Sequence, residues 1–244
     1  MNDSKTIEML RALRLTAMAD VFETSLRLGP SQSQSLGELV AHMTEAEWNA
    51  REHRRTERLL KQATLRILAS LEEIEFSKER NLERSAFMTV ASMDWVQRGA
   101  TILITAATGA GKTFIACALG HEACLRGISV RYTPATKLLP QLRIARGDGS
   151  YAAEIKRLAK TSLLIIDDFG LSPLEHDDAL ALLEILDDRY HKAGTIVTSQ
   201  RPVATWHELI NEPTIGDAVM DRLAHTPYIF QLKGGSRRRK HDSD

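Results

Sequence analysis

A short apolar run followed at once by a glycine-rich segment constrains this chain more than any other feature of its sequence. Residues 101–105 read TILIT, and residues 106–113 read AATGAGKT. The apolar run is typical of a buried strand, and the glycines allow backbone N–H groups to converge on an anion without obstruction by side chains. A helix opening after Gly111 would add its positive dipole end at the same place. The segment predicts a strand–loop–helix unit that cradles phosphate groups, and an ordinary strand–helix turn is the alternative.

The segment has the chemistry of a P-loop for Mg·ATP. Lys112 would reach the β- and γ-phosphates, and the hydroxyl of Thr113 would ligate Mg²⁺. The pattern G-x-x-x-x-G-K-[ST] has glycine where this chain has Ala106. Alanine costs something there only if the position needs a positive φ, so we expect weakened rather than abolished binding. The expected nucleotide-binding residues are Ala106, Ala107, Thr108, Gly109, Ala110, Gly111, Lys112, Thr113 and Phe114.

Two carboxylates follow a second apolar run. Residues 163–166 read LLII and lead directly into Asp167 and Asp168. Parallel strands deliver their carboxyl ends to the edge of a sheet where ligands bind. Asp167 is therefore expected to hold Mg²⁺, directly or through water. Asp168, on the opposite side of the strand end, is expected to orient or polarise the attacking water. The alternative is that both residues cap the next turn.

Two further segments carry candidate catalytic groups. A later apolar run ends in Thr198, Ser199 and Gln200, which would place polar side chains beside the γ-phosphate. Arg222 lies in a helical stretch far along the chain, where it could stabilise charge in the transition state. A surface ion pair is the commoner fate of such an arginine.

The chain has two regions of different sequence pattern, which meet near residue 95. Residues 1–94 favour helices: Leu10, Leu13, Ala17 and Val21 share helical spacing. A loop is expected after residues 29–31, which read GPS. A second helix is expected from Thr44, where residues 44–47 fit a capping box, through residue 68. A third helical piece is expected over residues 81–96.

From residue 100 onward short apolar runs alternate with helical stretches, which predicts βαβ units and a parallel sheet covered on both faces. We therefore expect an α/β fold in which a small all-helical domain precedes a three-layer αβα domain. The expected boundaries are 1–94, 95–235 and a basic tail, 236–244, that contains residues 237–240, RRRK. The strand candidates are residues 101–105, 128–132, 163–166, 195–198 and 228–230, and the helical stretches follow Gly111 and cover residues 135–145 and 177–190.

Four arginines form a basic stripe on the second predicted helix. Arg51, Arg54, Arg55 and Arg58 recur at i, i+3, i+4 and i+7, and Lys61 and Arg66 extend the stripe. Such a face suits phosphate contacts that are salt-sensitive and largely independent of base sequence. A solvated face that pairs with acidic neighbours is the alternative, and no interleaved aromatic residues argue for stacking on single strands.

Composition excludes several classes of protein. Lysine plus arginine and aspartate plus glutamate both number 32, so any basic surface must be local. No apolar run approaches the roughly 20 residues of a membrane span, and the N-terminus lacks the apolar core of a signal peptide. We therefore expect a cytoplasmic protein without a membrane partner. Cys117 and Cys124 are expected to be buried side chains rather than a disulfide or zinc site.

Together these motifs resemble an AAA+ ATPase of the branch that contains DnaA, DnaC and the IstB-like transposition helper proteins. Matching residues run from about residue 8 to Lys233, and the similarity to the IstB-like group is the strongest. The segments that carry it are residues 46–52, 104–120, 163–170, 198–200 and 216–223.

The resemblance implies roles for individual residues. Lys112 and Thr113 become the Walker A pair, and Asp167 and Asp168 the Walker B pair. Gln200, with Ser199 behind it, is similar to the sensor 1 position, and Arg222 resembles an arginine finger that enters a neighbouring subunit's site. Ala106 departs from the family's usual glycine, and the residues give no conventional sensor 2 arginine.

The resemblance also implies a function: an ATP-dependent regulator of transposition that forms ring-like or helical homo-oligomers on duplex DNA, remodels it and delivers it to a partner transposase. ATP or ADP and Mg²⁺ would be its cofactors. A DnaC-like helicase loader is the runner-up. A small-molecule P-loop kinase is disfavoured because the arginines do not converge on a pocket, and Ala106 leaves open a scaffold that binds ATP but hardly hydrolyses it.

Overall fold

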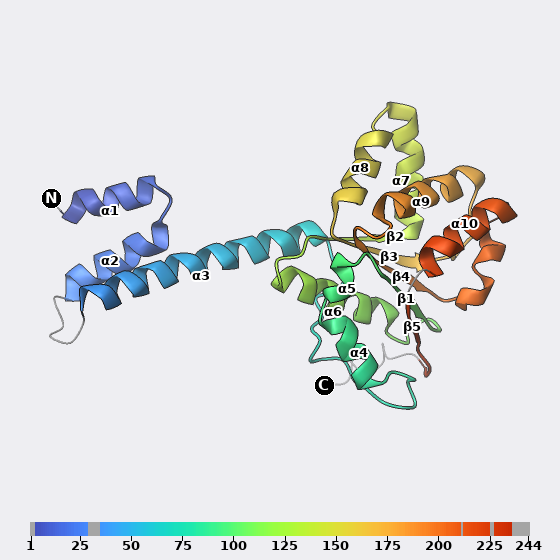
Figure 1. Ribbon diagram of the computed structural model, residues 1–244, viewed down its shortest axis with the longest axis horizontal. Coiled ribbons are helices and arrows are strands. Elements are labelled where there is room, and N and C mark those ends of the chain that lie inside the picture. Colours follow the sequence, from blue (N-terminus) through green and yellow to red (C-terminus); the bar gives the residue numbers. More distant parts are fainter. Residues whose placement is uncertain (1–2, 29–34, 211, 225–226, 236–244) are drawn as a thin grey trace. The chain divides into compact units, whose positions relative to one another are not determined.

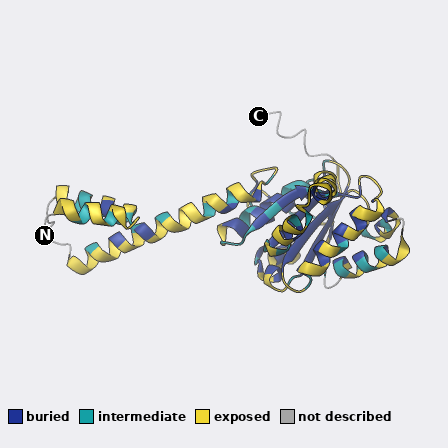
Figure 2. Ribbon diagram, turned by 90° about the horizontal axis from the view of Figure 1, so that it is seen from above, coloured by how far each residue is buried: buried dark blue, intermediate teal, exposed yellow. Residues whose placement is uncertain are grey.

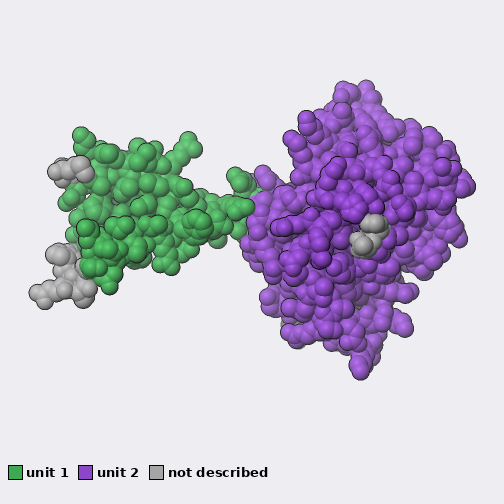
Figure 3. Space-filling model, viewed as in Figure 1, with its two compact units in different colours: residues 1–58 green, residues 59–244 purple. Residues whose placement is uncertain are grey.

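The computed structural model describes residues 3–28, 35–210, 212–224 and 227–235. The chain forms two compact units, residues 1–58 and residues 59–244 (Figure 3). This division differs from the domain boundary predicted after residue 94, because residues 59–94 pack with the sheet. Leu59, Leu82 and Phe87 are buried in the same core as Ile102. The loop predicted at residues 29–31 and the basic tail lie outside the described residues.

The first unit contains α1 (Asp3–Ala12), α2 (Thr16–Leu28) and most of α3 (Leu36–Ala63). The single helix predicted around Leu10 and Val21 is wrong, since the chain turns between α1 and α2. Arg14 has a φ of 60°, its N–H bonds to the Arg11 carbonyl, and the Leu15 N–H bonds to the Leu10 carbonyl. That is the hydrogen-bond pattern of a Schellman motif, which ends a helix at a left-handed residue.

The start predicted for the second helix, at Thr44, is also wrong. A capping box lies earlier: the Ser35 N–H donates to Glu38 Oε2 at 2.7 Å, and the Glu38 N–H donates to Ser35 Oγ at 3.2 Å. Thr44 lies inside α3, where its hydroxyl bonds to the Val40 carbonyl. The helix ends at Ala63 rather than at residue 68, because Thr64 is left-handed with a φ of 52°.

The second unit is a parallel sheet with helices on both faces (Figure 1). The strand order is β2-β3-β4-β1-β5. The strands are β1 (Thr101–Thr105), β2 (Val130–Pro134), β3 (Leu163–Phe169), β4 (Gly194–Ser199) and β5 (Tyr228–Gln231). The helices are α4 (Arg84–Ala91), α5 (Asp94–Gln97), α6 (Lys112–Leu125), α7 (Ala135–Asp148), α8 (Tyr151–Lys160), α9 (His176–Arg189) and α10 (Pro213–Ala224), with short 3₁₀ turns at Val203–Thr205 and His207–Leu209.

Alternation along the strands separates two hydrophobic cores. Ile102 and Ile104 of β1 face the core that contains α4, α5 and α6, whereas Leu103 between them faces the core of α7, α8, α9 and α10. The sheet is therefore buried on both sides, as the dark strands in Figure 2 show. This three-layer α/β arrangement is the fold class predicted from the sequence.

The predicted elements differ from the observed ones mainly at their ends. The strand predicted over residues 128–132 is β2, which begins at Val130. Residues 81–96 form two helices, α4 and α5, because Met93 is left-handed with a φ of 67°. Helix α8 was not predicted.

The strand order brings the candidate motifs to one edge of the sheet. β4 lies between β1 and β3, with Thr105 opposite Ser199 and Ile166 opposite Val197. All three strands are parallel, so their carboxyl ends open onto the same edge. None of the helices in the described ranges is long and apolar enough to cross a membrane.

Candidate nucleotide site

The loop between β1 and α6 uses two left-handed glycines. Gly109 and Gly111 have φ values of 82° and 96°, and Gly111 caps α6, whose first residue is Lys112. The Lys112 side chain is buried, and its Nζ donates to the Ala106 carbonyl at 2.9 Å and the Ala107 carbonyl at 3.1 Å. The ammonium therefore lies within the loop, at the N-terminus of α6, where an anion is favoured.

A buried arginine braces the loop from outside. Arg80 Nη2 donates to the Ala110 carbonyl at 3.2 Å, and Nη1 donates to the Glu75 carbonyl. A Cβ on Gly111 would lie 3.1 Å from Arg80 Nη2. Glycine at 111 is thus favoured both by backbone conformation and by space. Arg80 was not predicted as a site residue, because only the folded chain brings it to the loop.

The backbone conformation of Ala106 is one that alanine adopts without strain. It is absent from the described residues with positive φ, and its N–H continues the ladder between β1 and β4 by bonding to the Ser199 carbonyl at 3.2 Å. The conformational penalty considered for alanine therefore does not arise. Phe114, expected to contact nucleotide, packs against the core that contains α6.

Asp167 is fully buried, and its carboxylate accepts hydrogen bonds from three hydroxyl groups. Thr113 Oγ1 lies 2.9 Å from Asp167 Oδ2 and 3.1 Å from Oδ1, the Tyr132 hydroxyl donates to Oδ2 at 2.5 Å, and the Thr198 hydroxyl donates to Oδ1. Burial, and then the bond to Asp167, raise the pKa of Tyr132. Tyr132 therefore stays a donor, and neither it nor Thr198 was predicted as a partner of Asp167.

Asp168 has a strained backbone and a different partner. Its φ is 54°, and its N–H bonds to Thr198 Oγ1 at 3.1 Å. Arg66 Nη1 lies 3.5 Å from Asp168 Oδ2 and 3.9 Å from Asp167 Oδ2. The prediction that Arg66 extends the arginine stripe of α3 is wrong, because α3 ends before it and its guanidinium faces these carboxylates.

Ser199 and Gln200 take separate positions at the end of β4. The Gln200 amide oxygen accepts a hydrogen bond from Thr108 Oγ1 at 2.7 Å, so Gln200 faces the P-loop. Buried Ser199 donates to the Phe169 carbonyl at 2.7 Å and joins the ends of β3 and β4. The catalytic roles expected for both residues stay predictions.

Arg222 lies on α10, and its partners lie on α9, on α10 itself and at the residue that follows α9. Its Nε lies 2.6 Å from Asp187 Oδ1, its Nη1 lies 2.6 Å from Asp221 Oδ2, and its guanidinium lies 5.0 Å from the centre of the Tyr190 ring. Asp187 is the chief cause that raises the pKa of Arg222. Among the described residues, these contacts do not bring Arg222 to its own P-loop, and its role in a neighbour's site stays a prediction.

The arginine stripe in the first unit is exposed and partly paired. Arg51 Nε and Arg54 Nη2 lie 2.9 and 3.3 Å from Glu47 Oε1, and Arg55 Nη1 lies 3.8 Å from Glu52 Oε1. Glu47 is buried and also accepts the Ala17 N–H. Arg51 and Arg54 thus help to balance a buried carboxylate, and the predicted DNA contact of the stripe, including Arg58, stays a prediction.

The residues at the sheet edge fit Mg·ATP. The Thr113 hydroxyl and the Asp167 carboxylate are oxygen ligands of the kind that Mg²⁺ prefers, and Mg²⁺ is commonly held by one carboxylate together with substrate phosphates. Within the described ranges no group of three or more histidine, cysteine, aspartate or glutamate residues forms a metal cage. The buried lysine, the left-handed glycines and the open helix N-terminus supply the phosphate cradle.

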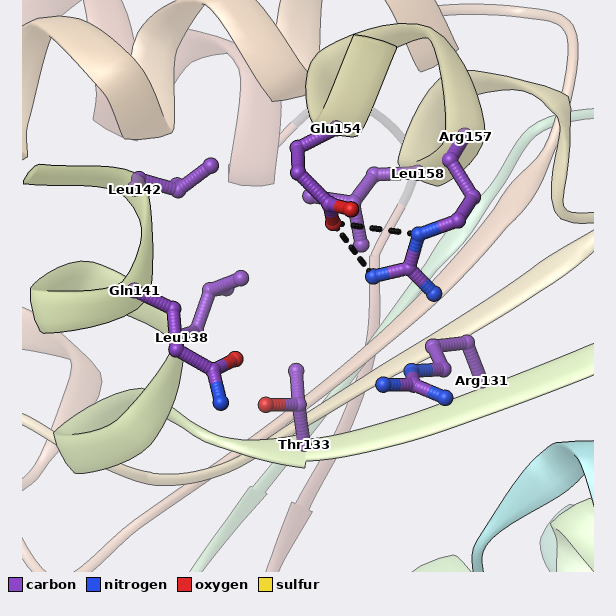
Figure 4. Close-up of a pocket in the computed structure, with 8 residues that line it drawn as sticks. All are labelled: Arg131, Thr133, Leu138, Gln141, Leu142, Glu154, Arg157 and Leu158. Atoms are coloured by element: carbon purple, nitrogen blue, oxygen red, sulfur yellow. Dashed lines mark hydrogen bonds and ion pairs between the residues drawn. The ribbon is translucent and has the colours of Figure 1, made fainter. Parts of the chain in front are cut away.

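The structure also contains a separate pocket, lined in part by Arg131, Leu138 and Leu158 (Figure 4). It is lined by residues of β2, α7 and α8, and among them Arg157 donates two hydrogen bonds to Glu154 Oε2. None of the predicted site residues lines it.

Comparison with known proteins identifies relatives over nearly the whole chain. The family model described as IstB-like ATP binding protein matches residues 8–244. An insertion sequence ATP-binding protein of Sinorhizobium fredii is 41% identical over 234 residues, which is 96% of this chain and 96% of that protein. The ATP-binding protein of insertion sequence IS21 from Pseudomonas aeruginosa is 28% identical over 232 residues, 95% of this chain and 88% of that protein.

Solved structures of other proteins share the fold of this chain over about two thirds of its length. DnaI matches with a TM-score of 0.60 at 20% identity, over 69% of this chain and 92% of that chain. The DnaC helicase loader matches with a TM-score of 0.58 at 18% identity, over 68% and 97% of the two chains. At these identities the likeness concerns the fold alone.

Proposed function

The chain belongs to the IstB-like ATP-binding proteins, and from that premise we propose that it assembles on duplex DNA, remodels it and delivers it to a partner transposase. Members of this family bind ATP, and the relatives named above belong to insertion sequences. The chain is an ATPase associated with transposition. DNA remodelling and delivery to a transposase are the steps proposed here.

The observation that carries the proposal is the meeting of Lys112, Thr113 and Asp167 at one edge of the sheet. Thr113 Oγ1 donates a hydrogen bond to Asp167 Oδ2 at 2.9 Å, and Lys112 lies in the phosphate cradle. Mg²⁺, bound by these two residues, would neutralise charge on the β- and γ-phosphates. Lys112 would bind the same phosphates, and Asp168 would polarise the attacking water, with Gln200 and Ser199 at the adjacent strand end.

Oligomerisation would complete the site. The Arg222 side chain is 31% exposed, and its partner Asp187 is 49% exposed. An ion pair between side chains with this exposure contributes little free energy, so Arg222 can exchange Asp187 for another anionic partner at little cost. Arg222 is therefore available to a neighbouring subunit, where its charge would stabilise the transferring phosphoryl group.

Duplex DNA would bind the first unit through Arg51, Arg54, Arg55 and Arg58. These side chains lie on one face of α3 and are exposed. Their contacts with phosphate would be independent of base sequence and would weaken as salt is raised. DNA would then gather subunits and raise the rate of hydrolysis.

The proposal is tested by mixing two inactive variants. Lys112→Ala keeps Arg222 but lacks the phosphate-binding lysine, whereas Arg222→Ala keeps the P-loop but lacks the arginine. On duplex DNA, each alone should hydrolyse ATP at least about tenfold more slowly than the wild type, and their mixture should recover part of the lost rate. Arg126→Ala, which removes an exposed arginine paired with Glu122, is the control and should retain full activity.

Two outcomes would contradict the proposal. Equal rates for wild type and Arg222→Ala, with and without DNA, would exclude a finger acting between subunits. A DnaC-like helicase loader would respond to single-stranded rather than duplex DNA. Stimulation by single strands alone, with no binding of the transposase encoded in the same insertion sequence, would favour the loader.

A further inference from the structure

Arg66 is a cation at the catalytic edge that comes from outside the nucleotide motifs. Its guanidinium faces both acidic residues at the end of β3, 3.5 Å from Asp168 Oδ2 and 3.9 Å from Asp167 Oδ2. The Tyr132 hydroxyl is the largest cause that raises the pKa of Arg66, and the two aspartates add to it. Arg66 therefore lies among the polar groups that surround the candidate Mg²⁺ ligands.

The backbone before Arg66 is anchored. α3 ends at Ala63, which is buried, and Thr64 turns the chain with a φ of 52°. The Thr64 hydroxyl donates to the Tyr132 carbonyl at 3.3 Å, which ties the segment to β2. The backbone position of Arg66 thus follows from a fixed turn two residues earlier.

The two aspartates differ in how they are held. Asp167 is buried and receives hydroxyl groups from Thr113, Tyr132 and Thr198. The Asp168 side chain is 23% exposed, and Arg66 is its partner among the described residues. Three hydrogen bonds therefore fix the orientation of the Asp167 carboxylate, whereas the orientation of the Asp168 carboxylate depends on Arg66.

We propose that Arg66 is a positioning residue for ATP hydrolysis, which holds the Asp168 carboxylate in the orientation from which it polarises the attacking water. The proposal rests on the role proposed for Asp168. Arg66 also places a positive charge beside the Mg²⁺ ligand Asp167, so it opposes Mg²⁺ binding there while it orients the neighbouring carboxylate. The effects on turnover and on Mg²⁺ affinity therefore have opposite signs.

The experiment compares Arg66→Ala, Arg66→Lys and the wild type as full-length chains. Arg66 is half exposed, and pairs of this kind contribute little to folding, so both variants should remain folded. Arg157→Ala is the matched control, because Arg157 is similarly exposed and pairs with a carboxylate, Glu154, on its own helix α8. ATP turnover, binding of a fluorescent ATP analogue and the half-saturating Mg²⁺ concentration are measured for each.

Arg66→Ala should lower kcat about tenfold while the dissociation constant of the ATP analogue stays within about threefold of the wild type. Its half-saturating Mg²⁺ concentration should fall roughly two- to fivefold, because an opposing charge is gone. Arg66→Lys keeps the charge, so its Mg²⁺ dependence should stay at the wild-type value and its kcat should lie between the other two. Arg157→Ala should behave as wild type in all three measurements.

Unchanged turnover and Mg²⁺ dependence in Arg66→Ala would overturn the proposal. Equal losses of turnover and ATP binding, or a rise in the half-saturating Mg²⁺ concentration, would assign Arg66 a general structural role and overturn it as well. A wild type that does not hydrolyse ATP would instead defeat the ATPase function itself. If Asp168→Asn retained full turnover while Asp167→Asn lost it, the role of Asp168 on which Arg66 depends would fail.

Discussion

The Thr113 hydroxyl donates a hydrogen bond to Asp167 at 2.9 Å, which joins the first turn of α6 to the end of β3. These two residues lie 54 positions apart in the chain, and β4 lies between β3 and β1, the strand that leads into the P-loop. Contacts within the chain thus orient both candidate Mg²⁺ ligands. Little conformational entropy remains to be lost there when Mg·ATP arrives.

Thr113→Val should abolish hydrolysis while it leaves the fold intact. Valine has nearly the same shape but lacks the hydroxyl, so Asp167 loses a donor and Mg²⁺ loses a ligand. We expect kcat to fall at least about a hundredfold. Thr113→Ser retains the oxygen and should keep most of the activity. Turnover measured over a range of Mg²⁺ concentrations checks this, and a Val variant as active as the Ser variant would contradict the assignment.

Substitutions at Ala106 and Gly111 should have opposite consequences. Ala106→Gly should leave the affinity for ATP within about threefold of the wild type, because the position needs no positive φ. Gly111→Ala should weaken ATP binding at least about tenfold, because its φ of 96° is strained for alanine and its Cβ would meet Arg80 Nη2 at 3.1 Å. Titration with a fluorescent ATP analogue measures both. Tighter binding in Ala106→Gly would mean that the alanine does impair the loop.

The fold and half of the site follow from local sequence patterns. The apolar runs before Ala106 and Asp167 predict strands, and the meeting of parallel strand ends predicts that Lys112, Thr113 and Asp167 lie together. These inferences succeed because each depends on a few consecutive residues. The fold class and the family were predictable for the same reason.

The rest of the site depends on contacts between distant residues. Nothing near Arg66 in the sequence indicates that it faces Asp168, since its position depends on the left-handed Thr64 and on β2. Tyr132 reads as an ordinary strand residue until the pairing of β2 with β3 brings its hydroxyl to Asp167. Residues 35–38 and 44–47 both fit the pattern of a capping box, so the pattern alone does not decide where the helix begins.

Ser35→Ala should loosen the first turn of α3, whereas Thr44→Ala should not. Ser35 Oγ accepts the Glu38 N–H, and losing such a cap costs about 0.5–2 kcal/mol. Thr44 lies inside the helix, where alanine has the higher propensity. Amide hydrogen exchange of residues 36–39 should accelerate about tenfold in Ser35→Ala. Faster exchange at residues 44–47 in Thr44→Ala would restore the helix start predicted from the sequence.

Ionisation of Cys124 should lower the free energy of unfolding as the pH is raised above 9. Its thiol is buried on α6, and burial raises its pKa from 9.0 to about 11. A raised pKa means that the folded state holds the proton more tightly than the unfolded state. The resulting stabilisation is complete below pH 9 and is lost as the pH rises toward 11. In Cys124→Ala this contribution is absent, although the smaller side chain lowers stability by a constant amount at every pH.

The difference in unfolding free energy between wild type and Cys124→Ala should therefore shrink as the pH is raised from 8 to 11, and urea denaturation followed by circular dichroism measures it. Ile115→Val, a buried truncation on the same helix with no ionisable group, should keep a constant difference from the wild type over that range. A difference for Cys124→Ala that stays flat or widens would mean that the thiol ionises equally easily in the folded and unfolded chains.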